Sequence, residues 1–381
     1  MRALVIFRSL LEDRTISQFV SLLNAADEDE FLNACASFEA SLFETGDNWS
    51  EYLSHAVLSC DNPAVRLQAA GRTSDVIADA LEKELAVLNS AASVTLDQFS
   101  FPAKALFAGW NTSECDLGPA YVRRLEAVTR CGYGIYADYY VFTFDEHGLQ
   151  PVRYPDPQRL SELPGYEAER RRVIANVNAL LDNRPAVNVL LYGDAGTGKS
   201  STIKAIVNEF HHRGLRLVEV RRDQLFRIPA LLEQLAEQPL KFILFIDDLS
   251  FAEGDDNFAA LKAILEGSVA RQASNTIIAA TSNRRHLVRE KASDRFSDDL
   301  HENDTRQEIL SLSARFGLII TFQKPDKDRY LHIIHELAKR YGVFEDPQLL
   351  EERAEAFALR AGGRTPRTAK QFIEQIRSGV L

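Results

Sequence analysis

Long apolar runs are missing from this chain of 381 residues. No stretch approaches the roughly eighteen consecutive apolar residues of a membrane-spanning helix, so we expect no membrane segment. The apolar run that begins at Ala3 ends before Glu12, Asp13 and Arg14, and it is too short for a signal peptide. These absences predict a cytoplasmic protein with no membrane partner.

Cysteine is also scarce. The four cysteines, Cys35, Cys60, Cys115 and Cys131, are far apart and form no CxxC pair. Because structural zinc sites and disulfide frameworks use paired or regularly spaced cysteines, we expect neither. We interpret all four as small buried apolar side chains.

Basic residues are few in the first part of the chain, and the formal net charge of −11 is therefore unevenly distributed. Residues 1–150 contain 10 basic and 22 acidic residues, whereas the rest contains 34 and 33. This change, together with the chain length, predicts two or three domains with a boundary near residue 150. The acidic first part disfavours nucleic-acid binding by simple electrostatics.

Residues 1–150 are expected to form a mainly helical domain with a short β segment near 133–144. The tyrosines of that segment either pack in a buried sheet, which we favour, or form an exposed stacking surface. Four prolines between Pro151 and Pro164 predict a proline-rich linker over 151–164.

Gly193–Ser200 has the pattern G-x-x-x-x-G-K-[ST] of a phosphate-binding loop, the Walker A motif. An apolar strand-like segment precedes it, and a segment with helical spacing follows. Its glycines let the loop curl so that successive N–H groups point inward. Together with the positive end of the following helix, these donors make a site for a polyphosphate. The residues expected to bind the nucleotide are Gly193, Asp194, Ala195, Gly196, Thr197, Gly198, Lys199, Ser200 and Ser201.

Within this loop, Lys199 is expected to reach the β- and γ-phosphates of ATP, and the Ser200 hydroxyl is expected to ligate Mg²⁺. Two carboxylates, Asp247 and Asp248, end the apolar run that starts at Lys241. A buried strand that opens onto an active site has this pattern. We predict that Asp247 holds Mg²⁺ and that Asp248 orients the attacking water, with Asn283 at the end of another strand contacting the γ-phosphate or the water.

Alternating strands and helices over residues 165–324 predict a three-layer α/β core with a parallel sheet and a ligand at the carboxyl ends of its strands. The expected strands are 187–192, 215–220, 241–246, 276–283 and 318–322. Helical patterns over 327–341, 348–361 and 366–376 predict a helical lid spanning 325–381.

The order of these motifs, followed by Arg315 and the segment Gly362–Arg367, resembles that of the AAA+ ATPases. More narrowly, residues 150 to 381 resemble a bacterial family of uncharacterised AAA+ ATP-binding proteins, and the runs that carry this resemblance are Gly165–Glu167, Phe245–Phe251, Thr281–Leu287 and Leu310–Leu318. The resemblance implies a P-loop NTPase (AAA+) fold and a homo-oligomer, either a ring or an ATP-dependent assembly.

The resemblance also implies roles for single residues. Asn283 corresponds to sensor 1, and Arg315 to the arginine finger that is supplied to a neighbouring subunit. Arg367 corresponds to sensor 2, with Arg364 as the competing candidate. One residue departs from the family pattern, because Asp248 stands where many AAA+ enzymes have glutamate. Aspartate is one methylene shorter, which disfavours fast turnover unless a shifted water restores the geometry.

The sequence therefore predicts an ATP-binding protein that hydrolyses ATP to ADP and phosphate and remodels a macromolecular partner bound by residues 1–150. Two alternatives stay open. The first is an ATP-dependent switch or scaffold with slow or no hydrolysis, which Asp248 favours. The second is a nucleic-acid-associated loader, for which Arg170–Arg172 and Arg284–His286 are the basic clusters.

Overall fold

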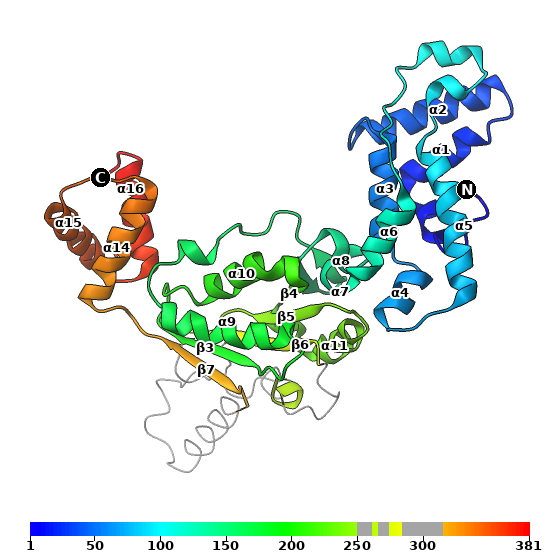
Figure 1. The fold of residues 1–381 in the computed structure, drawn as a ribbon. Coiled ribbons are helices and arrows are strands. Elements are labelled where there is room, and N and C mark those ends of the chain that lie inside the picture. Colours follow the sequence, from blue (N-terminus) through cyan, green and yellow to red (C-terminus); the bar gives the residue numbers. More distant parts are fainter. Residues whose placement is uncertain (250–260, 266–273, 284–314) are drawn as a thin grey trace. The chain divides into compact units, whose positions relative to one another are not determined.

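The computed structural model describes residues 1–249, 261–265, 274–283 and 315–381. The chain forms two compact units, Met1–Asp138 and Tyr139–Leu381 (Figure 1). The basic cluster Arg284–His286 and most of the run Leu310–Leu318 lie outside the described residues. Within the described ranges, no helix combines the length and apolar character needed to cross a membrane.

The N-terminal unit (1–138) is helical, as expected. Side chains at the starts of its first five α-helices, Asp13, Asp27, Asn48, Asn62 and Ser74, accept backbone N–H groups of the first turn and so cap the helices. Its α-helices are α1 (Arg14–Leu23), α2 (Glu28–Phe43), α3 (Trp49–Ser59), α4 (Pro63–Ala69), α5 (Asp75–Ala92), α6 (Leu117–Glu126), α7 (Val128–Cys131) and α8 (Ile135–Asp138). Its 3-10 helices are η1 (Arg8–Glu12), η2 (Leu96–Gln98) and η3 (Pro102–Leu106).

An aromatic cluster forms the core of this unit. Phe19, Phe38 and Trp49 are fully buried, and their ring centroids lie 4.2 to 5.1 Å apart. The Trp49 indole N–H donates to the carbonyl of Ala91 at 2.9 Å, so its one polar atom is satisfied. These rings fill the interior and hold the helices together.

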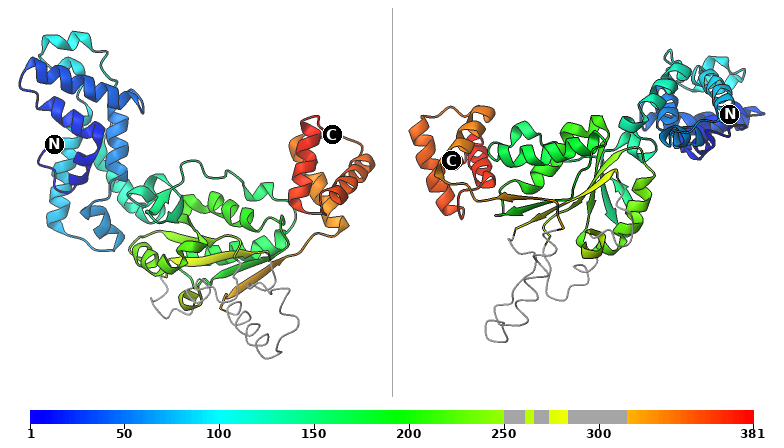
Figure 2. Two further views of the ribbon diagram at one scale, coloured as in Figure 1. Left: turned by 180° about the vertical axis from the view of Figure 1, so that it is seen from behind. Right: turned by 60° about the horizontal axis from the view of Figure 1, so that its bottom comes forward.

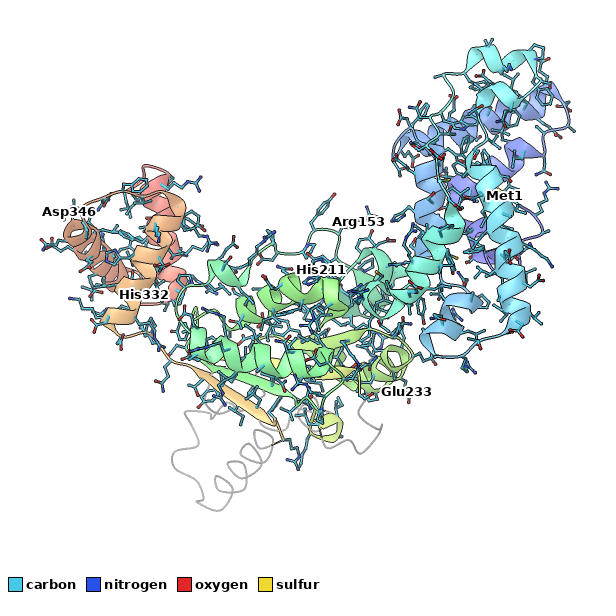
Figure 3. All side chains as sticks on the ribbon, viewed as in Figure 1. Met1, Arg153, His211, Glu233, His332 and Asp346 are labelled. Atoms are coloured by element: carbon cyan, nitrogen blue, oxygen red, sulfur yellow. The ribbon has the colours of Figure 1, made fainter. Side chains whose placement is uncertain are left out.

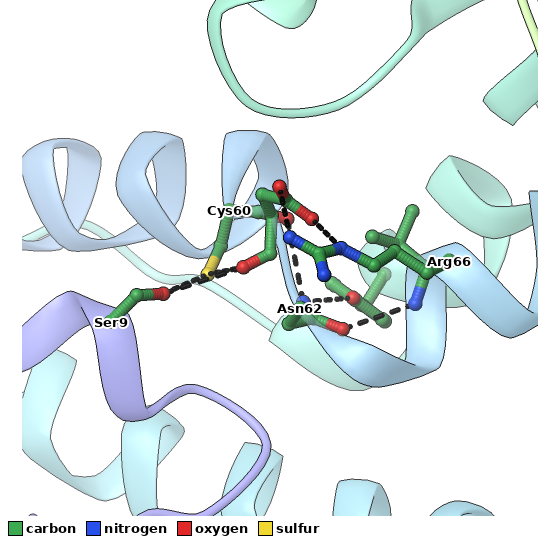
Figure 4. A network of polar contacts seen from close by, with 7 residues as sticks. Ser9, Cys60, Asn62 and Arg66 are labelled. Atoms are coloured by element: carbon green, nitrogen blue, oxygen red, sulfur yellow. Dashed lines mark hydrogen bonds and ion pairs between the residues drawn. The ribbon is translucent and has the colours of Figure 1, made fainter. Parts of the chain in front are cut away.

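The turn before α4 is held by a network of polar contacts, some buried and some exposed (Figure 4). Asn62 accepts the Val65 N–H at 3.1 Å and donates to the Tyr121 hydroxyl at 2.7 Å, which joins α4 to α6. The Cys60 thiol lies 3.3 Å from the Ser9 hydroxyl, and burial raises the pKa of the Cys60 thiol. Cys35 is buried like Cys60, whereas Cys115 and Cys131 are only half-buried.

The C-terminal unit (139–381) contains a seven-stranded sheet in the order β2-β1-β4-β5-β6-β3-β7. All neighbouring strands are parallel except β1 and β2, which form an antiparallel hairpin. The strands are β1 (Val141–Asp145), β2 (Gly148–Pro151), β3 (Val189–Gly193), β4 (Leu215–Val220), β5 (Lys241–Ile246), β6 (Thr276–Ser282) and β7 (Leu318–Phe322). The five expected strands are present, and the hairpin extends their sheet.

The hairpin changes the division of the chain that the sequence suggested. Of the β segment expected near 133–144, only Val141–Phe144 is strand, within β1, whereas Ile135–Asp138 forms the helix α8. Val141–Phe144 pairs with Leu217–Val220 of β4. Phe142 and Phe144 are buried, as a sheet strand requires. The two units therefore separate between Asp138 and Tyr139, whereas charge and composition placed a boundary near residue 150. Strand pairing is a long-range contact, which local composition cannot register.

The segment 151–164 also differs from its expected role as a linker. It contains the 3-10 helix η4 (Leu160–Glu162) and runs along α10 (Lys199–Phe210) of the C-terminal unit. The Asn208 amide donates to the carbonyls of Asp156 and Gln158 at 2.7 Å each. Backbone acceptors are independent of residue type, so the proline content did not reveal this attachment.

Helices cover both faces of the sheet. α9 (Glu167–Leu181) and α10 lie on one face, and α11 (Ile228–Ala236) lies on the other (Figure 2). Every residue of β6 is buried, because this strand is enclosed on both faces. The 3-10 helices η5 (His211–Arg213) and η6 (Arg222–Arg227) complete this part. The predicted three-layer α/β fold with a mostly parallel sheet is confirmed.

Three helices after β7 form the lid, namely α14 (Lys327–Tyr341), α15 (Pro347–Arg360) and α16 (Pro366–Arg377). In Figure 3, His332 marks α14 and Asp346 marks the start of α15. Side chains of α14, among them Ile333 and Leu337, belong to the same apolar cluster as Val173 and Val177 of α9. The lid therefore packs continuously against the core.

Candidate functional site

The predicted site residues meet at one edge of the sheet. The phosphate loop follows β3, Asp247 follows β5, and Asn283 follows β6. Tyr192 pairs with Ser282, and Ile246 with Ala280, so these three strands end together. Parallel strands thus bring to one place residues that are far apart in sequence.

The glycines of the phosphate loop are required by its geometry. Gly193 has φ +139°, and a Cβ there would lie 2.1 Å from the carbonyl oxygen of Phe322 in the neighbouring strand β7. Gly196 and Gly198 also have positive φ, at +76° and +91°. The Thr197 hydroxyl donates to the Asp194 carbonyl at 2.8 Å and closes the loop.

Lys199 is buried, and its ammonium donates to three oxygens. These are the carbonyls of Gly193 at 2.9 Å and Asp194 at 2.8 Å, and the Asn283 side-chain oxygen at 2.8 Å. Desolvation lowers its pKa, against the opposing effect of Asp194 and Asp247. Since an ammonium has three protons, an incoming phosphate must displace one of these acceptors.

One oxygen of Asp247 collects several donors. It accepts the Ser200 hydroxyl at 2.6 Å, the Thr281 hydroxyl at 2.5 Å and the Asp248 N–H at 3.1 Å. The Ser200 hydroxyl and the Asp247 carboxylate are hard oxygens of the kind that Mg²⁺ prefers, with phosphate and water completing its shell. These residues therefore fit a magnesium ion.

Thr281 is a site residue that the sequence reasoning missed. Besides donating to Asp247, its hydroxyl accepts the Asp248 N–H at 2.9 Å. The signal was its position two residues before Asn283, because residues two apart on a strand point to the same face.

Asn283 links Lys199 to Asp248. Its amide nitrogen donates to the Asp248 carboxylate at 2.7 Å, while its oxygen accepts Lys199. Only this orientation of the amide satisfies both neighbours. Asp248 itself has φ +51°, a left-handed conformation that is uncommon outside glycine. In this arrangement the Asp248 carboxylate is held by Asn283.

A cavity of about 490 Å³ joins these residues to the lid. Ala195–Ser201 of the loop, Asp247, Asp248 and Asn283 line one part, whereas Gly193 and Asp194 are not in its lining. The other walls come from the predicted linker and lid, whose residues the sequence did not assign to the site; they include Gln158, Leu163, Pro164, Ile333 and Leu337. Of the run Gly165–Glu167, Tyr166 lines the cavity, stacked on Phe322 at 5.2 Å between ring centroids.

The two candidate arginines of the lid lie in different surroundings. Arg364 makes two hydrogen bonds to Glu355, at 2.8 and 2.5 Å, and this carboxylate raises the pKa of Arg364. Arg367 lines the cavity, and its backbone N–H donates to the Gly196 carbonyl at 3.2 Å. Arg367 therefore faces the phosphate loop, whereas Arg364 is engaged within the lid.

Arg315 lies elsewhere. It precedes β7, whose first residue, Leu318, pairs with Val189 at the start of β3. The loop begins at the other end of β3, beside Phe322. Arg315 is therefore at the edge of the sheet opposite the cavity, and it is not among the described residues that line it.

A family model described as "Protein of unknown function (DUF815)" matches residues 137–380, which contain the whole cavity. This match confirms the resemblance to an uncharacterised family over this part of the chain. None of the curated proteins matches the sequence.

Similar solved structures include RuvB of Thermotoga maritima, described as a Holliday junction branch migration motor, at 20% identity and a TM-score of 0.37. Two variants of RuvB match at 19% identity and a TM-score of 0.40. In each case the match covers 58% of this chain and 65% of the RuvB chain, so this chain spans about two thirds of that length.

Proposed function

We propose a function for this chain, which belongs to the family described as "Protein of unknown function (DUF815)": it binds ATP with Mg²⁺ and hydrolyses ATP to ADP and phosphate. The observation that carries the proposal is the convergence of Lys199, Asp247 and Asn283 on one cavity from three strand ends. Glycine-loop N–H groups at a helix N-terminus favour a polyphosphate. The walls at Tyr166 and Leu337 leave room for the base and sugar.

Each residue has a distinct task in this proposal. Lys199 replaces one of its three present acceptors with a phosphate oxygen and neutralises negative charge on the phosphate. Ser200 and Asp247 would hold Mg²⁺, which supplies further charge neutralisation to the phosphates. Asp248 orients the water that attacks the γ-phosphate, and Asn283 positions that water. Arg367 approaches the γ-phosphate from the lid.

The position of Arg315 supports a role in a neighbouring subunit. β7 (Leu318–Phe322) separates it from the edge that holds the phosphate loop. At about 3.3 Å per residue this strand spans roughly 13 Å, which is beyond the reach of an arginine side chain. We propose that Arg315 completes the site of an adjacent copy in a homo-oligomer, where such a finger raises the rate about 10³- to 10⁵-fold.

A second candidate function is an ATP-dependent switch or scaffold with slow turnover. The specific observation in its favour is the 2.7 Å hydrogen bond from Asn283 to Asp248. It holds a side chain that is already shorter than glutamate, and water activation requires this carboxylate to be released. The two functions share the same binding step and differ in turnover.

The partner is proposed to bind the N-terminal unit. Residues 1–138 contain 10 basic and 20 acidic residues. This charge favours a protein partner, and one with a basic surface, over nucleic acid. If the chain is an ATPase, as in the first candidate function, ATP turnover in the C-terminal unit remodels that partner.

The decisive experiment measures ATP binding and turnover at several protein concentrations. We compare the wild type with Lys199→Ala, Asp248→Ala and Arg315→Ala. Lys204→Ala, on the same helix as Lys199, is the control for lysine removal. We expect Lys199→Ala to abolish binding, and Asp248→Ala and Arg315→Ala to bind ATP with little turnover.

The outcomes separate the candidates. Activity per subunit that rises with concentration and is lost in Arg315→Ala supports the assembled ATPase. Binding without turnover above that of Lys199→Ala supports the switch. If the wild type does not bind ATP, both candidates fail.

A further inference from the structure

Asp194, the second residue of the phosphate loop, joins the loop to the hinge that leads into the lid. Its carboxylate accepts the backbone N–H of Lys324 at 2.8 Å. Its own N–H donates to the Phe322 carbonyl at 3.1 Å. Phe322 is the last residue of β7, and Lys324 stands between β7 and the start of α14, so the two contacts hold Asp194 against the strand end and the connection that follows it.

The same residue also contacts the group that would sense the phosphate. The Asp194 carbonyl accepts the Lys199 ammonium at 2.8 Å and the Thr197 hydroxyl at 2.8 Å. The sequence pattern placed Asp194 among the nucleotide-binding residues, but Asp194 does not line the cavity and its carboxylate is engaged by the Lys324 N–H. One residue therefore faces Lys199 with its carbonyl and the hinge with its side chain.

Lys324 extends the connection to the turn between α15 and α16. Its ammonium donates to the Gly362 carbonyl at 3.3 Å. A Cβ at Gly363, which has φ +130°, would lie 2.0 Å from that ammonium. The missing side chain at Gly363 thus makes the space that Lys324 occupies. Pro325 follows directly and restricts Lys324 to extended backbone conformations, so the hinge has few alternatives at this step.

The phosphate loop also contacts the lid directly, at the start of α16. The Arg367 N–H donates to the Gly196 carbonyl at 3.2 Å, and a Cβ at Gly196 would lie 3.2 Å from the Arg367 Cβ. The loop is therefore attached to the lid at the start of α16 and, through Asp194 and Lys324, at the turn before it.

We propose that Asp194 is a positioning residue that couples occupancy of the phosphate loop to the position of the lid. A phosphate that draws Lys199 away from the Asp194 carbonyl breaks one hydrogen bond of Asp194 and so changes its backbone position. The hydrogen bond from the Lys324 N–H to the Asp194 carboxylate then moves Lys324, and the hydrogen bond from the Lys324 ammonium moves Gly362. The inference rests on the proposed nucleotide binding and deepens it, because it names the regulatory path from the site to the lid.

The test uses the full chain and a non-hydrolysable ATP analogue with Mg²⁺. Calorimetric titration measures binding. Hydrogen exchange measures the ligand-induced protection of the loop and of residues 355–363, a lid segment that does not line the cavity. The variants are Asp194→Ala and Asp194→Asn, whose side-chain oxygen still accepts the Lys324 N–H. Asp182→Ala, which removes an exposed carboxylate that binds Arg213, is the control.

We expect Asp194→Ala to bind the analogue and to protect the loop, while the ligand-induced protection of residues 355–363 falls about fivefold or more. Asp194→Asn and Asp182→Ala should behave as the wild type does. A purely structural role would lower protection in both segments with and without ligand.

Two outcomes overturn the inference and leave nucleotide binding intact. One is wild-type protection of residues 355–363 in Asp194→Ala, and the other is a wild-type lid segment that does not respond to bound analogue. If the wild type fails to bind the analogue in the titration, the proposed function fails and this inference fails with it.

Discussion

Two glycines of the phosphate loop should differ sharply in their tolerance of alanine. At Gly193 a Cβ would lie 2.1 Å from the Phe322 carbonyl oxygen and 2.6 Å from its carbon. Both atoms are backbone, and the oxygen accepts the Asp194 N–H at 3.1 Å, so it cannot move without opening the contact between β3 and β7. At Gly198 nothing lies within 4 Å of the added Cβ.

The magnitudes follow from these surroundings. Both positions carry backbone strain for alanine, with φ of +139° and +91°, which costs about 1–3 kcal/mol. Only Gly193→Ala adds overpacking, which costs about a further 1–3 kcal/mol. We therefore expect a loss of unfolding free energy of about 4 kcal/mol for Gly193→Ala and about 2 kcal/mol for Gly198→Ala. For a unit of this size each kcal/mol lowers the melting temperature by roughly 2–4 °C.

Thermal and denaturant unfolding followed by circular dichroism measure this difference. Trp49 and Trp110 both lie in the N-terminal unit, so tryptophan fluorescence reports that unit separately. We expect its fluorescence transition to keep its midpoint in both variants. Equal losses of stability at Gly193 and Gly198 would refute the reasoning, because the close approach to Phe322 would then have no energetic consequence.

Two further predictions address one side chain in each unit. Thr281→Val removes the hydroxyl that donates to Asp247 and accepts the Asp248 N–H, so ATP turnover should fall about tenfold or more while ATP binding persists. Thr276→Val on the same strand is the control. An unchanged kcat in Thr281→Val contradicts the assignment of Thr281 to the site. Burial raises the pKa of Glu39, which accepts the Gly109 N–H at 2.7 Å. As pH rises, this carboxyl loses its proton at a lower pH in the unfolded state than in the folded state. The unfolding free energy of the N-terminal unit should therefore fall as pH rises from about 4.5 through the raised pKa of the folded state. Glu39→Gln should flatten this dependence in tryptophan-monitored unfolding, and an unchanged slope would exclude Glu39 as its source.

The phosphate loop and its flanks could be predicted because their signals are local. Glycine spacing, Lys199 and Ser200 follow one another in sequence, and the loop requires them in that order. Asp247 could be recognised in the same way, from carboxylates at the end of an apolar strand. The number and direction of the five central strands followed from the alternation of strand and helix patterns.

Contacts between distant segments were decided by the tertiary structure. The hairpin β1–β2 joined the sheet through pairing with β4, and the segment 151–164 became a wall of the cavity by binding α10. Neither contact has a residue-type requirement that a sequence pattern could show. The surroundings of Arg364 and Arg367 are a similar case, because Glu355 engages only one of them.

The sequence by itself determined the chemistry of the phosphate loop, since its backbone needs glycine and its charge needs lysine at adjacent positions. Only the tertiary structure decided what that loop is attached to. Asp194 has the same place in the motif whatever lies beside it, and its contact with Lys324, 130 residues away, exists because β7 pairs with β3 and ends at the hinge. Long-range pairing of this kind depends on the whole sheet, which no local pattern specifies.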